Sequence, residues 1–441
     1  MSGNVLLKDA RIIRKDGSIE GPSDILVESG VIRAVVKAGA GVQVNPEAET
    51  IDCSGCFASP GLVNLHTHSP MTVFRGIAED VSIEDWFNAK IWPYESRLTP
   101  ADVRVGAMLA IYEMLDSGVT AFFDHYFFSR EIVRAAEDAG IRADIAPTIF
   151  GAAPNWKDAL RESVRLAEEV NGKNGRVRVR IGPHAPYTCP PDVLKTCVEE
   201  ARNLGVGIHI HVSETAKQVE DSLKLYGKTP FKVLYDVGAM EVPCVFAHGI
   251  WITEDDLSLL NDRCFFAVAP KTYLKLAAGF GNLYRFMSKP ASVRSIHVGA
   301  GTDGAASSNT LNPLEQARLF SLLGKHHMGD ATCFDLNTTW GILMKGHEAL
   351  GQDTGDVAPG FAADIVIWDL NQGNTVPVYD PLAAIIYSAD GRNVRDVLVG
   401  GEFRKRGGKV IAIDLDEVMR DVELVKERLL REGGGQAVVR Y

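Results

Sequence analysis

Residues 60–76 read PGLVNLHTHSPMTVFRG. The stretch begins as an apolar run and continues into two histidines, His66 and His68, that are two residues apart. Because alternate side chains of a strand point to the same side, both imidazoles face one way where the strand ends. Two such nitrogens can bind one metal ion without a helix. The stretch predicts a buried strand that carries part of a metal site at its carboxyl end.

Seven more apolar segments follow, with amphipathic helical stretches such as residues 102–118 and 192–205 between them. The strand candidates in order are LVNLH, VTAFFD, IRADIAPTIF, RVRVRIGPH, VGIHIHV, PCVFAH, CFFAVAP and SIHVGAGTD. This alternation is typical of βα units and a parallel sheet. We therefore predict an α/β fold in which residues 61–356 form a catalytic (β/α)₈ TIM barrel. A doubly wound open sheet is the alternative, although no G-x-G-x-x-G follows the first strand.

Both ends of the chain have a different texture. Residues 1–60 contain short β-type runs separated by glycine turns, which predict a small antiparallel unit. A similar texture returns near residue 357, and a charged helix is expected over residues 415–431. We predict that residues 1–60 and 357–441 pair into one small β-sandwich domain built from both termini.

Composition excludes several classes of protein. The 441 residues are 46% hydrophobic and 23% charged, which is ordinary for a globular protein. A net charge of −11 argues against binding to a nucleic-acid polymer, since such a surface needs an excess of basic residues. The sequence contains no run of about 18 apolar residues, so we predict no membrane span. The first residues lack a signal-peptide pattern and the 7 scattered cysteines fit reduced thiols, so we expect a cytoplasmic protein.

More potential metal ligands lie at the ends of other predicted strands. IHIHVSET, residues 208–215, carries His209, His211 and Glu214, and the eighth strand leads to Asp303. His211 is the better ligand candidate because it is nearer the strand end, whereas we expect His209 to be a core residue or to support a ligand. The sixth strand ends at His248. Imidazoles with one carboxylate suit zinc or ferrous iron better than magnesium or calcium.

Several motifs together resemble the amidohydrolase superfamily, within its cytosine-deaminase-like branch. They are PGLVNLHTHSPMTVFRG, HVSET, VFAHG, GTDGAASSNTLN and PGFAADIVIWDL. EDWFNAKIWPYESRLT, residues 84–99, and IGPHAPYTC, residues 181–189, are similar to the 5′-methylthioadenosine/S-adenosylhomocysteine deaminases. The resemblance covers almost the whole chain, and it implies a barrel of the metal-dependent hydrolase type that acts in the cytoplasm as a dimer or tetramer.

The resemblance also implies a role for each residue of the site. The implied metal ligands are His66, His68, His211 and Asp303. Glu214 would move a proton to the ring nitrogen, His248 would hydrogen-bond the attacking water, and Asp303 would accept the proton of that water. The residues implied to contact the substrate are Glu214, Asp303, Glu95, His184 and Trp86. Of these, Glu95 suits the ribose hydroxyls, and Trp86 would form an apolar wall. Strand four has no lysine where binuclear relatives carry a bridging one, so we expect one divalent ion, zinc first and iron as the alternative.

The chemistry is consistent with these residue types. A divalent metal can lower the pKa of its water from 15.7 to about 7, which makes a nucleophile available at neutral pH. Attack on an amino-bearing ring carbon also needs an acid beside the ring nitrogen, and such proton transfer is typically worth about 10² to 10⁴ in rate. The other zinc-deaminase signature, H-x-E with P-C-x-x-C, does not occur in the sequence.

One segment departs from the family pattern. Residues 265–279 read FFAVAPKTYLKLAAG, in which Val268 and Ala269 replace a histidine and its neighbour. Thr272 and Tyr273 stand where Ser-Asn is usual, and we expect Lys271 and Tyr273 to lie on a loop that faces the pocket. The third strand also lacks an arginine that some relatives carry. These changes leave the metal site intact and leave the exact substrate open.

Three hypotheses follow for function. The first is hydrolytic deamination of an adenine nucleoside, namely 5′-methylthioadenosine, S-adenosylhomocysteine or adenosine, to the inosine analogue and ammonia. The second keeps the metal mechanism but acts on guanine, a pterin, cytosine or an s-triazine, with chloride as a further leaving group. The third is a non-catalytic assembly protein on the same fold, which the complete set of expected ligands disfavours.

Overall fold

The strands of the barrel are the eight apolar segments of the sequence. The computed structural model describes residues 4–173, 175–288, 296–435 and 437. In β6 (Leu62–His68) every residue but the last is buried, as expected for a strand covered on both faces. The others are β7 (Val119–Tyr126), β8 (Arg142–Ile149), β9 (Val177–Val179) with β10 (Gly182–Pro183), β11 (Ile208–Val212), β12 (Cys244–His248), β13 (Cys264–Val268) and β14 (His297–Ala300) with β15 (Asp303–Gly304).

These strands close on themselves. One set of parallel strands runs β10-β8-β7-β6-β15, with β9 beside β8, and a second runs β11-β12-β13-β14. A parallel bridge between Ile181 and Ile208 joins the two sets on one side. On the other side the Gly301 N–H donates to the Val268 carbonyl at 3.0 Å, and the Thr302 N–H donates to the His66 carbonyl at 2.8 Å. The predicted (β/α)₈ barrel is confirmed.

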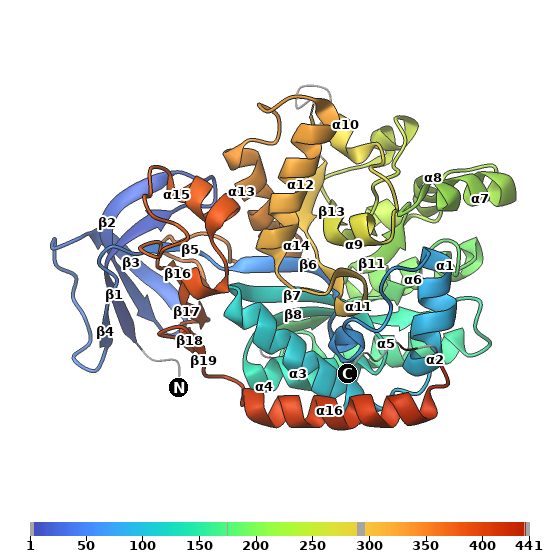
Figure 1. The fold of residues 1–441 in the computed structure, drawn as a ribbon, viewed down its shortest axis with the longest axis horizontal. Helices are drawn as coiled ribbons and strands as arrows, with labels where there is room; N and C mark the ends of the chain where they lie inside the picture. The colour runs from blue at the N-terminus through green and yellow to red at the C-terminus, as the bar shows by residue number, and fades with distance from the viewer. Residues whose placement is uncertain (1–3, 174, 289–295, 436, 438–441) are drawn as a thin grey trace.

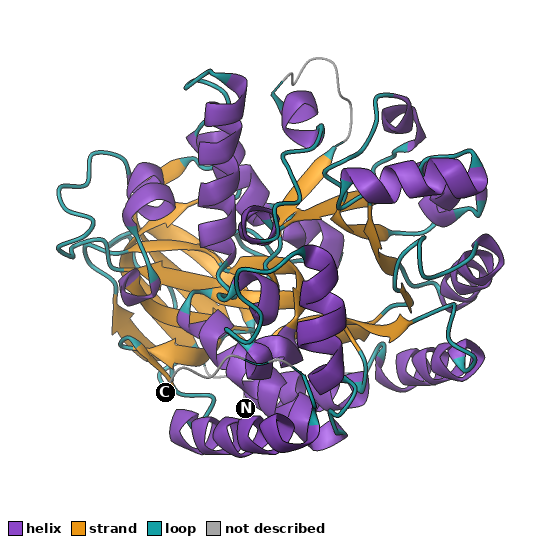
Figure 2. Cartoon of the chain, turned by 45° about the vertical axis from the view of Figure 1, so that its right-hand side comes forward, coloured by secondary structure: helices purple, strands orange, loops and turns teal. Residues whose placement is uncertain are grey.

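Helices surround the barrel strands (Figure 2). The predicted helix at 102–118 is α3 (Pro100–Asp116), which begins with Pro100 in its first turn and a capping box between Thr99 and Asp102. The helix predicted at 192–205 is α6 (Pro191–Leu204), which ends at Gly205 in the left-handed conformation. The other helices of the barrel are α4 (Ser129–Ala139), α5 (Trp156–Val170), α7 (Ala216–Tyr226), α8 (Pro230–Asp236), α9 (Pro270–Lys275), α10 (Leu283–Met287), α12 (Pro313–Met328), α13 (Leu336–Met344) and α14 (Gly346–Leu350).

Short helical turns follow β6 and β15, over the carboxyl ends of the strands. They are η1 (Ser69–Phe74), α1 (Ile83–Asp85), η2 (Trp86–Ile91), α2 (Trp92–Glu95) and α11 (Ala305–Ser308).

The two ends of the chain share one nine-stranded sheet, drawn in blue and red on the left of Figure 1. Its strands are β1 (Val5–Ile13), β2 (Ile19–Glu28), β3 (Val31–Lys37), β4 (Glu49–Asp52), β5 (Phe57–Pro60), β16 (Ile365–Trp368), β17 (Val394–Val399), β18 (Glu402–Arg406) and β19 (Lys409–Val410). The antiparallel pair of β5 and β16 joins the two halves. Most pairs of this sheet are antiparallel as predicted, but the sheet is mixed, because β1 pairs in parallel with β4 and β5. The exact domain boundaries, 60/61 and 356/357, stay a prediction.

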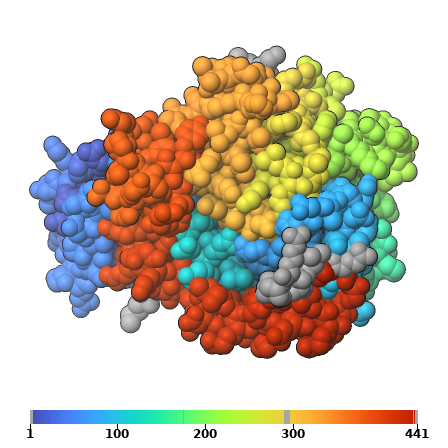
Figure 3. Space-filling model, in the orientation of Figure 1, coloured from blue at the N-terminus to red at the C-terminus, as the bar shows by residue number. Residues whose placement is uncertain are grey.

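The carboxyl-terminal helix lies along the barrel. Helix α16 (Leu415–Glu432) agrees with the helix predicted at 415–431, and Figures 1 and 3 show it in red at the lower edge of the molecule. Its Val425 and Leu429 belong to the same apolar core as the barrel residues. Arg428 pairs with Asp102 in the first turn of α3. Among the described helices, none combines the length and apolarity that a membrane span requires.

Candidate active site

Four side chains converge at the carboxyl ends of β6 and β11 and at Asp303, the first residue of β15. The Asp303 Oδ1 lies 3.2 Å from the His68 Nε2 and 3.6 Å from the His66 Nε2. The His211 Nε2 is 3.2 Å from the His68 Nε2. The nitrogens of the three histidines all lie within 4.8 Å of one another. These are the four residues that the sequence predicts as metal ligands.

The second nitrogen of each of these histidines is already held. The His68 Nδ1 lies 2.5 Å from the His125 carbonyl, and the His211 Nδ1 lies 2.9 Å from the His184 carbonyl. The His66 Nδ1 is 2.9 Å from the His209 Nε2. His209 therefore supports a ligand, which is one of the two roles expected for it from the sequence. Such contacts fix the ring so that Nε2 faces the centre. The buried His66 Nε2 has no hydrogen-bond partner among the described residues, which fits a cation held by three imidazoles and a carboxylate.

The protonation of the cluster also suits a cation. Burial lowers the pKa of His66 to about 3 and that of His211 well below its ordinary range, so both rings are neutral. Burial opposes ionisation of Asp303, but the contacts with His66 and His68 prevail and hold its pKa well below the usual range. Burial likewise opposes the charge on His68, yet Asp303 raises the pKa of His68 to about 9. A metal ion therefore competes with one proton at His68.

Two further groups complete the cluster. Glu214 lies between β11 and α7, where its backbone N–H donates to the Gln218 Oε1 at 2.9 Å. His248 is the last residue of β12 and is 1% exposed. The His248 Nε2 lies 3.8 Å from the Glu214 Oε1. All the predicted ligands and proton-handling residues thus belong to one cluster at the strand ends.

The residues expected to contact substrate surround this cluster. Glu95 in α2 is 5% exposed and accepts a hydrogen bond from the Tyr126 hydroxyl at 2.6 Å. Burial raises the pKa of Glu95, while Tyr126 opposes that shift. The His184 ring lies 4.9 Å from that of His211. The indole of the half-buried Trp86 donates to the carbonyl of Ala306, three residues beyond Asp303, at 3.3 Å.

The segment that departs from the family pattern reaches the site through Tyr273, as expected, but not through Lys271. Residues 270–275 form helix α9 rather than a loop. Lys271 turns to α12, where its Nζ lies 2.9 Å from the Glu315 Oε1. Tyr273 does lie in the site, 3.3 Å from the His248 Nδ1.

Sequence reasoning missed three more contacts. Thr272 and Ser307 both bind the Asp303 Oδ2, and Tyr126 binds Glu95. Ser307 stands in the quoted GTDGAASSN motif four residues after Asp303, a spacing that one helical turn brings close. Thr272 and Tyr126 carried no such signal.

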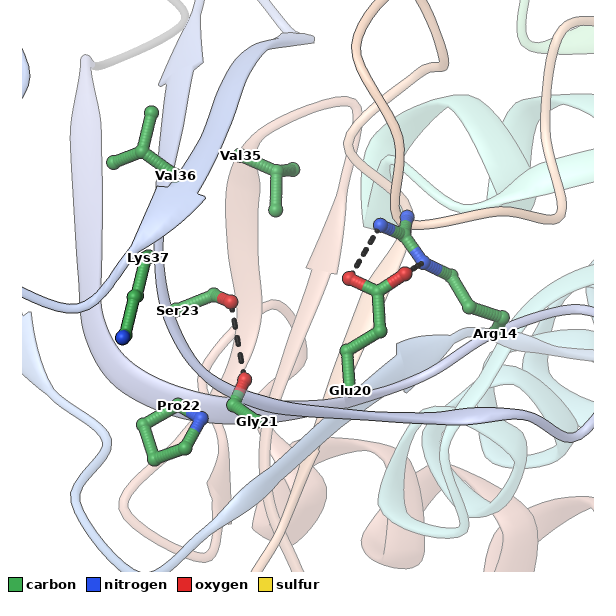
Figure 4. A pocket seen from close by; sticks show the side chains of 8 residues that line it. All are labelled: Arg14, Glu20, Gly21, Pro22, Ser23, Val35, Val36 and Lys37. Atoms are coloured by element: carbon green, nitrogen blue, oxygen red, sulfur yellow. Dashed lines mark hydrogen bonds and ion pairs between the residues drawn. The ribbon is translucent and has the colours of Figure 1, made fainter.

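A hollow of about 390 Å³ lies on the terminal sheet, away from the cluster (Figure 4). Its charged side chains are Arg14, Glu20 and Lys37, and Arg14 pairs with Glu20 at 2.7 Å. It lacks histidine and cysteine among its lining residues.

Comparisons with known proteins agree with this geometry. Residues 57–404 match the model of the amidohydrolase family. The chain is 37% identical to a 5-methylthioadenosine/S-adenosylhomocysteine deaminase of Desulforudis audaxviator, over 97% of this chain and 99% of that one. A protein of the same name from Caldanaerobacter subterraneus subsp. tengcongensis is also 37% identical, with 97% and 99% covered.

Solved structures give the same result. An adenosine deaminase from Xanthomonas campestris with bound zinc superimposes with a TM-score of 0.91 at 29% identity, covering 97% of this chain and 99% of that one. An atrazine chlorohydrolase from Arthrobacter aurescens TC1, complexed with zinc, has a TM-score of 0.86 at 22% identity over 96% and 100% of the chains, which shows a shared fold. The chain belongs to the amidohydrolase family.

Proposed function

We propose that this chain is a cytoplasmic hydrolase that deaminates an adenine nucleoside, namely 5′-methylthioadenosine, S-adenosylhomocysteine or adenosine. The observation that carries the proposal is the convergence of His66, His68, His211 and Asp303 beside Glu214. The names of the relatives in the two comparisons support the substrate class. The reaction consumes water and yields the inosine analogue and ammonia.

We propose that the four ligands hold one divalent ion, zinc before iron. Three imidazoles and a carboxylate match the donors that zinc prefers, once the ion has displaced the proton of His68. When bound, the ion acidifies water so that a nucleophile exists at neutral pH. Asp303, whose Oδ1 lies 3.2 Å from the His68 Nε2, would accept a proton of that water.

Glu214 carries protons to the substrate in this proposal. As water attacks the amino-bearing carbon of the ring, Glu214 gives a proton to the neighbouring ring nitrogen, so the electron pair of the C=N bond settles there. The carbon–nitrogen bond to the amino group then breaks, and the proton held by Asp303 leaves with ammonia. The proton of the remaining hydroxyl passes to Glu214, which restores its carboxyl group and leaves the C=O of the inosine analogue. His248 donates a hydrogen bond to the water and keeps it in line with the ring.

Recognition of the nucleoside is assigned to the polar groups around the cluster. Glu95 accepts hydrogen bonds from the ribose hydroxyls, and the Tyr126 hydroxyl holds the Glu95 carboxylate in one orientation. The His184 Nδ1 is 2.8 Å from the Thr188 hydroxyl, so the other ring nitrogen, Nε2, is the one that His184 would offer to the substrate. Trp86 forms an apolar wall. A dimer or tetramer is also proposed, from the resemblance.

The test is an assay of the zinc-loaded protein with the three nucleosides, followed by ultraviolet change and ammonia release. Turnover of at least one nucleoside is expected. Turnover of none, with zinc fully loaded, contradicts the proposal. A parallel panel of guanine, a pterin, cytosine and an s-triazine separates it from the second hypothesis, which predicts turnover there alone.

A further inference from the structure

Helix α9 brings two buried residues, Thr272 and Tyr273, against the working groups of the site. Thr272 is 0% exposed and Tyr273 is 4% exposed. One contacts Asp303 and the other contacts His248.

The hydrogen bonds of Tyr273 determine where its single proton goes. The Ala269 backbone N–H points at the Tyr273 Oη from 2.9 Å, and an N–H can only donate. The hydroxyl oxygen therefore acts as acceptor in that contact. Its own proton remains for the other neighbour, the His248 Nδ1 at 3.3 Å.

We propose that Tyr273 is a positioning residue that fixes the tautomer of His248. With Nδ1 accepting from Tyr273, the neutral ring carries its proton on Nε2. That nitrogen faces the site, 3.8 Å from the Glu214 Oε1. His248 then donates a hydrogen bond toward the reacting water and takes no proton from it, which leaves that task to Asp303. This inference rests on the proposed function.

Thr272 acts on Asp303 in a matching way, through separate hydrogen bonds. The Asp303 Oδ2 accepts from the Ser307 hydroxyl at 2.6 Å and lies 3.1 Å from the Thr272 hydroxyl, which also lies 3.1 Å from the Ser307 Oγ. The other oxygen, Oδ1, is the one that faces His68 at 3.2 Å. The two hydroxyls hold one oxygen and so direct the second to the metal ligands, as outer partners of a ligating carboxylate do.

The first experiment replaces Tyr273 by phenylalanine in the zinc-loaded enzyme. Tyr273→Phe keeps the ring and removes the donor, so we expect kcat to fall about tenfold or more, with KM and zinc content unchanged. Nitrogen-15 spectra of labelled histidine, assigned with a His248→Gln variant, report the tautomer directly. We expect a protonated Nε2 in the wild type and a mixture of both tautomers in Tyr273→Phe.

A matched control is Tyr284→Phe. Tyr284 is another buried tyrosine, and it stacks on Phe320 with ring centroids 4.4 Å apart. We expect it to leave kcat and the His248 signals unchanged. An unchanged tautomer in Tyr273→Phe, or a loss of zinc there, overturns the positioning role. Because the spectra need no substrate, a wild type that turns over no nucleoside refutes the proposed function separately.

The second experiment tests Thr272 by competition for zinc with a chelator. Removal of a partner outside the metal ligands typically costs 10- to 100-fold in metal affinity. We expect Thr272→Val to lose about tenfold, since Ser307 remains, and Thr272→Ser to restore the wild-type value. Thr339→Val removes another buried hydroxyl, in α13, and serves as the control. Equal zinc retention in Thr272→Val and the wild type overturns the assignment.

Discussion

His248, the last residue of β12, and Asp303, the first residue of β15, leave the ordinary strand conformation. Their φ angles are +72° and +60°, in the left-handed region that non-glycine residues seldom adopt. Such a conformation costs of order 1–3 kcal/mol per residue and persists only where surrounding contacts impose it. At these two positions it turns the side chains toward the centre of the site. The backbone is thus part of how the site is built.

At the residue scale, Glu214 is the most direct test of proton transfer. Glu214→Gln keeps the size of the side chain but cannot carry a proton, so we expect turnover to fall about 10² to 10⁴-fold. Zinc content is expected to stay at the wild-type level, since Glu214 is not among the proposed ligands. Steady-state rates and metal analysis measure both, with the exposed Glu220→Gln in the following helix α7 as control. A near-normal rate in Glu214→Gln contradicts the assignment.

The variant Asp303→Asn tests whether Asp303 is a metal ligand. The amide removes both the negative charge and the base, so we expect weaker zinc binding as well as loss of turnover. Chelator competition and ammonia release measure the two effects. If zinc binding remained at the wild-type strength, Asp303 would not be a ligand.

At the element scale, α14 is tied to the start of β6. The His347 Nε2 lies 2.8 Å from the Gly61 carbonyl, and its Nδ1 lies 3.0 Å from the Thr354 hydroxyl. The neutral ring satisfies both partners, as donor at one nitrogen and acceptor at the other. This contact holds the first strand of the barrel, and with it the metal-binding histidines at the other end of β6.

That contact predicts a dependence of stability on pH. Burial lowers the pKa of His347 from 6.5 to about 4. Between those values the unfolded chain binds a proton that the folded protein does not, so stability falls as the pH falls from 6.5 to 4. We expect His347 to account for about 2 kcal/mol of stability lost between pH 7 and pH 5.

The measurement compares chemical denaturation of the wild type and His347→Gln at both pH values. Glutamine offers a donor and an acceptor without titrating, so its loss of stability should be smaller by that amount. The exposed His327→Gln is the control. Identical pH dependence in wild type and His347→Gln would refute the prediction.

Helix α16 predicts a second effect at the element scale. Leu429 is 3% exposed and packs in the barrel core, while its neighbour Leu430 is 37% exposed. Leu429→Ala should lower the free energy of unfolding by about 2–5 kcal/mol, and Leu430→Ala by much less. Denaturant midpoints measure both. Equal shifts would mean that α16 does not dock as described.

At the scale of the whole molecule, the sequence predicted the parts whose signals are local. Eight apolar runs became the eight strand positions, and the histidines at their ends needed only the alternation of a strand to be placed. Contacts between distant segments escaped prediction. The bond between Tyr273 and His248 depends on how β13 and β12 lie side by side and on where α9 begins. Likewise, the pattern of α16 predicted a helix but not that it would lie on the barrel beside α3.

The central claim is that the strand-end cluster adds water to an adenine nucleoside and releases ammonia. The most direct measurement is mass spectrometry of the product formed by the zinc-loaded enzyme in ¹⁸O-labelled water. The account predicts an inosine analogue that carries one ¹⁸O atom, with one ammonia released per product. A nucleoside recovered unchanged, or a product without the label, would contradict it.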